Sequence, residues 1–250
     1  MNRTKPTWIL LRGLMRETRH WGAFPQAFAE ALDVQVVLID LPGNGRRHAE
    51  PSPTTVDGMA EALRGELRLR GLKPPWNLLA LSMGAMVAVA WAQAYPGEIE
   101  RAVLANTSLR PFSPFYRRLQ PRAWARFLQL ALGPPSDRDI ERRILELTTT
   151  TRDETVLDDW IAWRRECPVG RANAIRQLAA AARYRAPPRA PLQKLLLLSG
   201  AGDALVHPSC SERLAQRWNR ELRTHPSAGH DLPFDDGEWV IEMLRRWLQA

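Results

Sequence analysis

The chain has 250 residues, and 45% of them are hydrophobic, which is typical of a globular protein rather than a disordered one. This length suits one sizeable domain, or one domain with a small insertion. No apolar run reaches the roughly 18 residues that a membrane-spanning helix needs, so we expect no membrane span. The isolated Cys167 and Cys210 indicate neither a zinc site nor a disulfide framework, and we expect a cytoplasmic protein.

The net charge of +8 is concentrated in the middle of the chain. Residues 110–189 contain 16 Arg, no Lys and 9 acidic residues, which gives this stretch a net charge of +7. Two interpretations stay open: solvated helix faces, or attraction to an acidic partner or an anionic substrate. Because acids are interspersed and no nucleic-acid motif accompanies the arginines, we expect no nucleic-acid partner.

The first hundred residues predict strands that alternate with helices. The strands are expected at Trp8–Leu14, Val34–Asp40, Trp76–Leu81 and Arg101–Asn106. The helices are expected at residues 21–32, 56–71 and 83–94, and a capping box of Thr54 with Asp57 should begin the second. This alternation predicts an α/β fold with a mostly parallel sheet, covered by helices on both faces. With the two strands predicted near the end of the chain, at 194–199 and 221–225, the sheet should have about six strands.

Residues 109–191 break this alternation. They contain many prolines and no convincing strand, and they predict helices at 115–132, 137–149, 154–166 and 171–184. Capping boxes are expected for Ser136 with Asp139 and for Thr151 with Glu154. Afterwards the alternation resumes with strands at 194–199 and 221–225 and helices at 209–218 and 238–248. We therefore predict a core of residues 1–108 and 192–250 that carries an inserted helical cap, residues 109–191.

The segment Ala80-Leu81-Ser82-Met83-Gly84 lies between a predicted buried strand and a predicted buried helix. It is close to the G-x-S-x-G nucleophile elbow, in which a sharp strand-to-helix turn exposes the serine hydroxyl at the carboxyl end of the sheet. Small residues two before and two after the serine let the strand and the helix pass each other. Ala80 replaces the first glycine of the pattern, and the alternative interpretation is that Ser82 only caps the helix.

A serine nucleophile needs a base, and the base needs an acid that orients it. Asp203 follows one predicted strand and His230 follows the last, so both should lie at the carboxyl end of the sheet beside Ser82. The order Ser, Asp, His is that of the triad on an α/β-hydrolase sheet. The backbone N–H groups of Met83, at the helix start, and of Leu14, after the first strand, are the candidates for an oxyanion hole.

Together these motifs resemble the α/β-hydrolase-fold serine hydrolases of the small, lidded esterase type, a group that includes pimeloyl-acyl-carrier-protein methyl ester esterases. The resemblance covers residues 8–108 and 192–249. It rests on the oxyanion motif Arg12-Gly13-Leu14, the loop Asp40–Gly45, the elbow, Gly202-Asp203 and Gly229-His230. Arg12 departs from the pattern, because the family usually has histidine there.

The resemblance implies a serine carboxylesterase that acts on a small-molecule ester and uses neither a metal nor an organic cofactor. An acidic acyl-carrier partner would suit the basic cap. Substrate contacts are expected from Arg12, Trp21, Trp124 and Trp160. For Arg12 a structural role stays open as an alternative, through bonds to nearby carbonyls or to Glu17.

Two other functions stay open for the same fold. A triad can serve a lyase of the menaquinone-pathway type that abstracts a proton from an anionic substrate, and the arginines would suit such a substrate. The fold also serves as a ligand receptor without turnover. An aspartate nucleophile is absent from the elbow, which argues against haloalkane dehalogenase and epoxide hydrolase chemistry.

Overall fold

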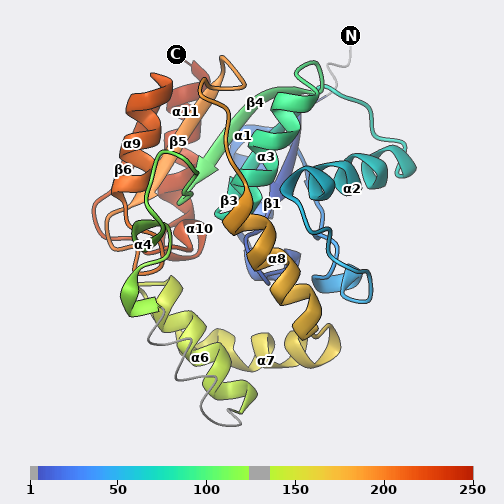
Figure 1. The fold of residues 1–250 in the computed structure, drawn as a ribbon, viewed down its shortest axis with the longest axis vertical. Helices are drawn as coiled ribbons and strands as arrows, with labels where there is room; N and C mark the ends of the chain where they lie inside the picture. The colour runs from blue at the N-terminus through green and yellow to red at the C-terminus, as the bar shows by residue number, and fades with distance from the viewer. Residues whose placement is uncertain (1–4, 124–135, 250) are drawn as a thin grey trace.

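The computed structural model describes residues 5–123 and 136–249 and shows a single parallel sheet (Figure 1). Its six strands lie in the order β2-β1-β3-β4-β5-β6. They are β1 (Thr7–Leu11), β2 (Gln35–Leu38), β3 (Trp76–Leu81), β4 (Ile99–Ala105), β5 (Leu195–Gly200) and β6 (Glu221–His225). All neighbouring strands pair in parallel, which confirms the predicted sheet of about six parallel strands.

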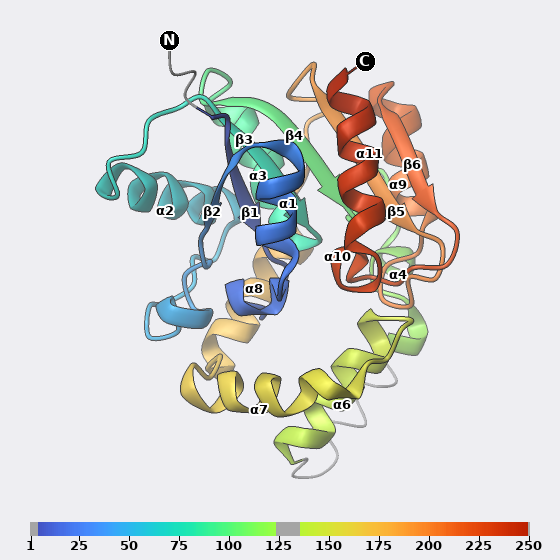
Figure 2. The same cartoon turned by 180° about the vertical axis from the view of Figure 1, so that it is seen from behind.

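Helices cover both faces of the sheet, as its continuous apolar strands require. One face carries α2 (Val56–Leu69), α3 (Met83–Ala94) and α9 (Ser209–Trp218). The other face carries α1 (Phe24–Leu32), α10 (Leu232–Asp235) and α11 (Gly237–Gln249), as the view from behind shows (Figure 2). Alternate residues of β1 divide between the two cores: Ile9 packs on the α3 side and Trp8 on the α1 side.

The helix α3 lies at the centre of the molecule. Every residue from Met83 to Ala92 is buried. The side chains on all sides of this helix are small or apolar, so no face of it needs contact with water. Trp91 on α3 meets Trp76 on β3 edge to face, with ring centroids 5.6 Å apart. A helix that is apolar on every face stays in place only when it is packed on all sides, and this burial fixes the start of α3 against the sheet.

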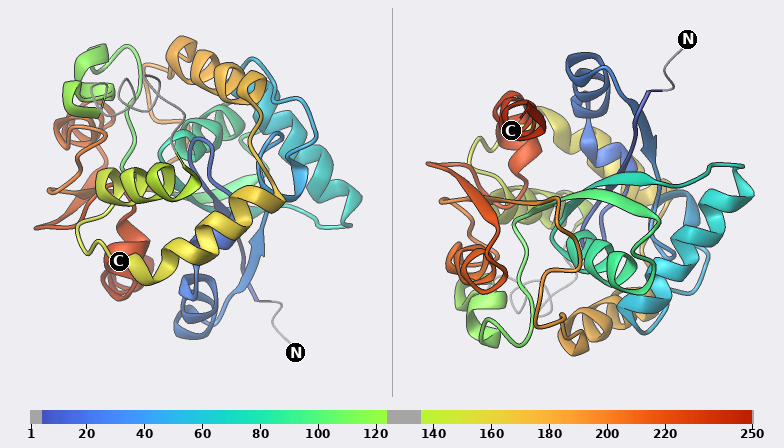
Figure 3. Two further views of the ribbon diagram at one scale, coloured as in Figure 1. Left: turned by 90° about the horizontal axis from the view of Figure 1, so that it is seen from below. Right: turned by 90° about the horizontal axis from the view of Figure 1, so that it is seen from above.

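Four described α-helices lie between β4 and β5: α4 (Phe115–Arg118), α6 (Asp137–Thr148), α7 (Leu157–Glu166) and α8 (Arg171–Arg183). In Figures 1 and 3, α6 and α7 lie beyond one end of the sheet, and α8 runs back towards α3. The Asp231 amide, after β6, donates to the carbonyl of Thr148 at the end of α6, so this is the carboxyl end of the sheet. We call residues 109–191 the inserted segment; part of the predicted helix 115–132 lies outside the described residues.

Short 3₁₀ helices replace some predicted turns and helix starts. They are η1 (Thr18–Trp21), η2 (Gly45–Arg47) and η3 (Glu154–Val156). The predicted helix at 21–32 therefore begins later, at Phe24, with Pro25 in its first turn, where the missing N–H costs nothing. Among the helices that the structure describes, none is long and apolar enough to cross a membrane.

One predicted capping box is confirmed and two are wrong. Ser136 and Asp139 form a reciprocal box at the start of α6. Thr55 rather than Thr54 caps α2, by accepting from the Gly58 amide at 3.1 Å. Thr151 does not cap a helix, because its amide and hydroxyl both donate to Asp235 of the core. Tertiary contacts decided these positions, and local spacing cannot indicate them.

Candidate active site

The turn between β3 and α3 holds Ser82 in a strained backbone conformation. Its φ of 56° and ψ of −115° lie in a region that residues other than glycine rarely adopt. Such strain costs on the order of 1–3 kcal/mol and persists only where the surrounding structure enforces it. At Gly84, a Cβ atom would lie 2.6 Å from the carbonyl oxygen of Arg12, so only glycine lets α3 begin this close to the end of β1.

The loop after β1 touches the serine directly. A Cβ atom on Gly13 would lie 3.0 Å from Ser82 Cβ and 3.5 Å from Ser82 Oγ. Leu14, the proposed second oxyanion donor, follows Gly13 in this loop. Met83 is the first residue of α3, and its N–H belongs to the turn whose amides have no partner within the helix. The loop and the helix start therefore meet at the Ser82 hydroxyl.

His230 and Asp203 form a buried pair. His230 Nδ1 lies 2.8 Å from Asp203 Oδ2, and the two residues are 5% and 1% exposed. The other carboxylate oxygen accepts the amides of Leu205 at 2.8 Å and Val206 at 2.9 Å. These amides fix the orientation of the carboxylate, which in turn holds the imidazole ring. The structure thus brings together two residues that stand 27 positions apart in the chain.

The end of β4 connects Ser82 with the histidine loop. The Ser82 amide donates to the carbonyl of Ala105 at 2.9 Å. The next residue, Asn106, donates from its side chain to the carbonyls of Gly229 and His230, both at 2.8 Å. Its side-chain oxygen accepts the Gly200 amide at 2.8 Å. Asn106 therefore joins the carboxyl ends of three strands around the site.

Sequence reasoning missed Asn106 as a site residue. It was expected only as the last residue of a strand, although a polar side chain at the carboxyl end of a buried strand is itself a signal. Gln120 was also missed: its buried side chain donates to the carbonyl of Asp203 at 2.8 Å. No spacing rule indicates that contact, because Gln120 lies in the inserted segment.

Arg12 pairs with the residue that follows the histidine. Its guanidinium donates two hydrogen bonds to the Asp231 carboxylate, at 3.0 and 2.5 Å, and it lies over the Trp21 ring at 4.7 Å. Its partner is therefore neither a carbonyl group nor Glu17. Arg12 is only 4% exposed, and Trp21 also stacks on Phe24. Both expected substrate contacts are therefore buried and packed against each other.

Trp160 is also buried, and Trp124 lies outside the described residues. The Arg16 guanidinium lies over the ring of Trp160, with its Cζ 4.1 Å from the ring centroid. The same ring meets His20 edge to face, with the two ring centroids 5.3 Å apart. Burial, reinforced by the charge of Arg16, lowers the pKa of His20 well below its usual value. His20 is therefore a neutral packing residue near neutral pH.

Helix α8 of the inserted segment contacts the loop beside Ser82 through a fully buried glutamine. Gln177 Oε1 accepts the Met15 amide at 3.0 Å, one residue after Leu14. Gln177 Nε2 donates to Asn44 at 2.7 Å and to Ser52 at 3.0 Å. This glutamine gave no signal in the sequence, since its role depends on how α8 docks.

No metal centre is formed by the part of the chain that the structure describes. Within residues 5–123 and 136–249, no group of three or more His, Cys, Asp or Glu side chains is placed to hold a metal ion. The polar groups at the end of the sheet instead form hydrogen-bonded pairs with one another.

Comparison with known proteins identifies the family. The family model described as "alpha/beta hydrolase fold" matches residues 9–237. The chain belongs to this family. It is also 25% identical to pimeloyl-[acyl-carrier protein] methyl ester esterase of Nitrosospira multiformis over 242 residues, which cover 92% of this chain and 89% of that protein.

Solved structures show the same fold. 2-Hydroxy-6-oxo-6-phenylhexa-2,4-dienoate hydrolase from Rhodococcus sp. strain RHA1 aligns with a TM-score of 0.79 at 20% identity, over 98% of this chain and 91% of that one. A thermophilic esterase from Thermogutta terrifontis aligns with a TM-score of 0.68 at 24% identity, over 98% and 90%. At these identities the likeness concerns the fold alone.

Proposed function

We propose that this protein is a serine hydrolase that cleaves a carboxylic ester through an acyl-enzyme intermediate. One observation carries the proposal: the strained Ser82 turn and the buried Asp203–His230 pair are joined by adjacent residues at the end of β4. A strained serine and an oriented imidazole at one end of a sheet are the parts that nucleophilic acyl transfer requires.

The first half of the reaction forms the acyl-enzyme. Ser82 Oγ attacks the ester carbonyl carbon while His230 Nε2 accepts the hydroxyl proton. Asp203, bonded to His230 Nδ1, stabilises the imidazolium. The C–O bond to the alcohol then breaks, and the imidazolium gives its proton to the leaving oxygen.

The second half releases the acid. A water molecule gives a proton to His230 and attacks the acyl carbon, and the bond to Ser82 Oγ breaks as that oxygen takes the proton back. In both halves the N–H groups of Leu14 and Met83 stabilise the negative carbonyl oxygen. Loss of one such donor typically raises the barrier by ~2.7–4 kcal/mol.

The inserted segment acts as a cap over this site. Its helices α6 and α7 lie beyond the carboxyl ends of the strands, and Gln177 on α8 holds the loop next to the serine. The relative from Nitrosospira is named for a carrier-linked pimeloyl methyl ester. A carrier-linked or similar ester is therefore our candidate substrate, with the cap arginines facing an acidic carrier.

Hydrolysis of a nitrophenyl ester series, from short to long acyl chains, tests the reaction. Ser82→Ala should abolish turnover, with a loss of roughly 10⁶ in kcat by analogy with another serine-triad enzyme. Ser227→Ala is the matched control, since this exposed serine lies in the histidine loop outside the proposed triad. Full activity of folded Ser82→Ala, or no ester hydrolysis by the folded wild type, would contradict the proposal.

A second assay tests the carrier. Replacement of Arg142 and Arg143 by Glu should raise KM for a carrier-linked pimeloyl methyl ester and leave KM for the nitrophenyl ester unchanged. Equal KM values for the carrier-linked ester in variant and wild type would reject the acidic carrier while leaving the esterase chemistry intact.

A further inference from the structure

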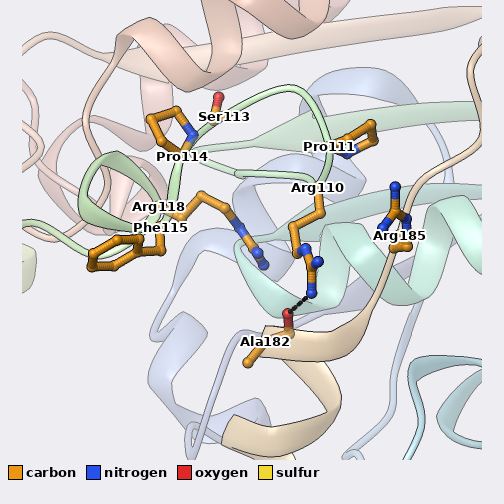
Figure 4. Close-up of a pocket in the computed structure, with 8 residues that line it drawn as sticks. All are labelled: Arg110, Pro111, Ser113, Pro114, Phe115, Arg118, Ala182 and Arg185. Carbon is orange, nitrogen blue, oxygen red and sulfur yellow. Dashed lines mark hydrogen bonds between the residues drawn. The ribbon is translucent and has the colours of Figure 1, made fainter.

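A cavity of about 440 Å³ lies between the loop after β4 and the C-terminal end of α8 (Figure 4). It is lined by Arg110, Pro111, Ser113, Pro114, Phe115, Arg118, Ala182 and Arg185. None of these residues belongs to the proposed triad or oxyanion hole. The volume falls within the ~300–1,000 Å³ of small-molecule sites.

Three of the eight lining residues are arginines and none is acidic. Within the described ranges 5–123 and 136–249, no ion pair is formed by Arg110, Arg118 or Arg185. Arg110 donates to the carbonyl of Ala182 at 3.3 Å, and Arg118 to that of Ala181 at 2.8 Å. Uncharged carbonyl groups only partly offset this concentration of positive charge.

Arg118 has hydrogen-bonding capacity left over. Its Nε is buried and, among the residues that the structure places, has no hydrogen-bond partner. Burial and the charge of Arg110 lower the pKa of Arg118, because both disfavour its charged form. An anion between the guanidinium groups would remove this penalty, because each guanidinium matches a carboxylate or a phosphate with two parallel hydrogen bonds.

The rest of the lining is apolar. Pro111, Pro114 and Phe115 contribute apolar surface to the lining, and Phe115 is 73% exposed. An exposed aromatic ring beside arginines favours a ligand that has an apolar part as well as a charged group. The cavity is also larger than an inorganic ion needs.

We propose that this cavity, the arginine pocket, binds a small organic anion whose carboxylate or phosphate group lies between Arg110, Arg118 and Arg185 while its apolar part packs on Phe115. The site is distinct from the proposed catalytic centre.

Isothermal titration of the full chain with benzoate, phenyl phosphate and phenol tests the proposal. At least one of the two anions should bind to the wild type, and phenol should bind at least about tenfold more weakly than that anion, because it lacks the charge. The better of the two anions identifies the head group. Binding should persist in Ser82→Ala, since the pocket does not include the serine.

Two variants locate the binding. Arg118→Gln and Arg185→Gln should each weaken the anion about tenfold or more, the loss of one charge-assisted contact. Arg246→Gln is the control, because this exposed arginine on α11 pairs with Glu242 far from the pocket. The Tm of each variant shows whether it folds. If Arg118→Gln does not fold, Arg185→Gln still tests the site, because Arg185 is exposed and its replacement should not disturb the fold. Anions that bind no better than phenol, or equally well to folded Arg185→Gln and Arg246→Gln, would overturn the proposal.

Discussion

The sheet and the inserted segment are held in place by different forces. Around α3 the core consists of apolar side chains from the sheet, α2 and α9, joined by a few from the two ends of the inserted segment. Within its described residues, the inserted segment has one small separate apolar cluster, Leu145, Leu157, Trp160 and Ile161. Buried polar contacts also attach it to the sheet domain, through residues such as Glu141, Asn173 and Gln177.

The two kinds of contact therefore have different roles, one in the stability of the fold and the other in the docking geometry of the inserted segment. Apolar burial supplies most of the free energy of folding but has little directional preference. A buried hydrogen bond adds only about 0.5–1.5 kcal/mol, yet leaving one partner unsatisfied costs about 1–3 kcal/mol, so one docking geometry is strongly preferred. The polar attachment therefore fixes where the inserted segment sits on a domain that the apolar core stabilises.

The largest effect is expected in the apolar core. Trp91→Ala removes a fully buried ring from α3, its contact with Trp76 and its hydrogen bond to Glu98. We expect a loss of about 3–5 kcal/mol in the free energy of unfolding, measured by urea denaturation. Trp163→Ala is the control, because Trp163 of the inserted segment is only half-buried. Its replacement should lower the free energy of unfolding clearly less than Trp91→Ala. Equal losses would remove the contrast between the two regions.

The next effect concerns the buried charge that docks α6. Glu141 is 2% exposed and accepts from Arg16 at 2.8 Å and from Arg164 at 3.2 Å. Glu141→Gln leaves the buried Arg16 without its counter-charge, and burial already lowers the pKa of Arg16. We expect a loss of about 2–4 kcal/mol in urea denaturation.

The matched control for this charge is an exposed pair in the same segment. Arg138 and Asp158 pair at 2.8 Å, with side chains 49% and 83% exposed. Arg138→Gln should change the free energy of unfolding by less than about 0.5 kcal/mol, because exposed ion pairs contribute little. A cost close to that of Glu141→Gln would show that burial does not set the energy of these contacts.

Gln177→Met should lower both the free energy of unfolding and the kcat of the proposed reaction. It leaves the Met15 amide and the Asn44 oxygen without partners, at a cost of about 1–3 kcal/mol in urea denaturation. Because the loop before Met15 carries the proposed oxyanion donor, kcat for nitrophenyl esters should fall while KM changes little. Gln216→Met, at an exposed position of α9, should change neither. A variant that unfolds more easily but keeps its kcat would assign Gln177 a purely structural role.

The smallest effect is a pH dependence at the opposite end of the sheet domain. Hydrogen bonds from Arg64, above all, lower the pKa of Glu98 to about 2 from an ordinary 4.5. This ionised carboxylate therefore stabilises the fold fully above pH 4.5, and its contribution is lost as the pH falls towards 2. Between pH 6 and pH 3 the wild type should lose about 1 kcal/mol more than Glu98→Gln in urea denaturation. Identical pH profiles would contradict this assignment.

Much of the sheet domain could be predicted, because its signals are local. Buried parallel strands appear as short apolar runs, and the positions just after such runs lie at one end of the sheet. That argument alone placed Asp203 and His230 near each other, and the structure joins them by a hydrogen bond. The strained turn at Ser82 was likewise indicated by its small neighbours.

The remaining features depend on docking, which no local pattern records. The partner of Arg12 is Asp231, 219 positions away, and nothing in either neighbourhood distinguishes it from Glu17. Gln177 and Asn106 are polar residues whose roles come from the elements packed against them. The arginine pocket forms where the two ends of the inserted segment meet, so its residues give no common signal in the sequence.

The Arg12–Asp231 pair also has a consequence for how the protein is made. A ribosome delivers Ser82 and the loop after β1 early, whereas Asp203, His230 and Asp231 belong to the last fifth of the chain. The nascent polypeptide therefore carries the proposed nucleophile without its base, and the long-range ion pair closes only after Asp231 has been synthesised. On the proposed mechanism, the unfinished chain cannot hydrolyse esters, and synthesis itself delays the onset of activity.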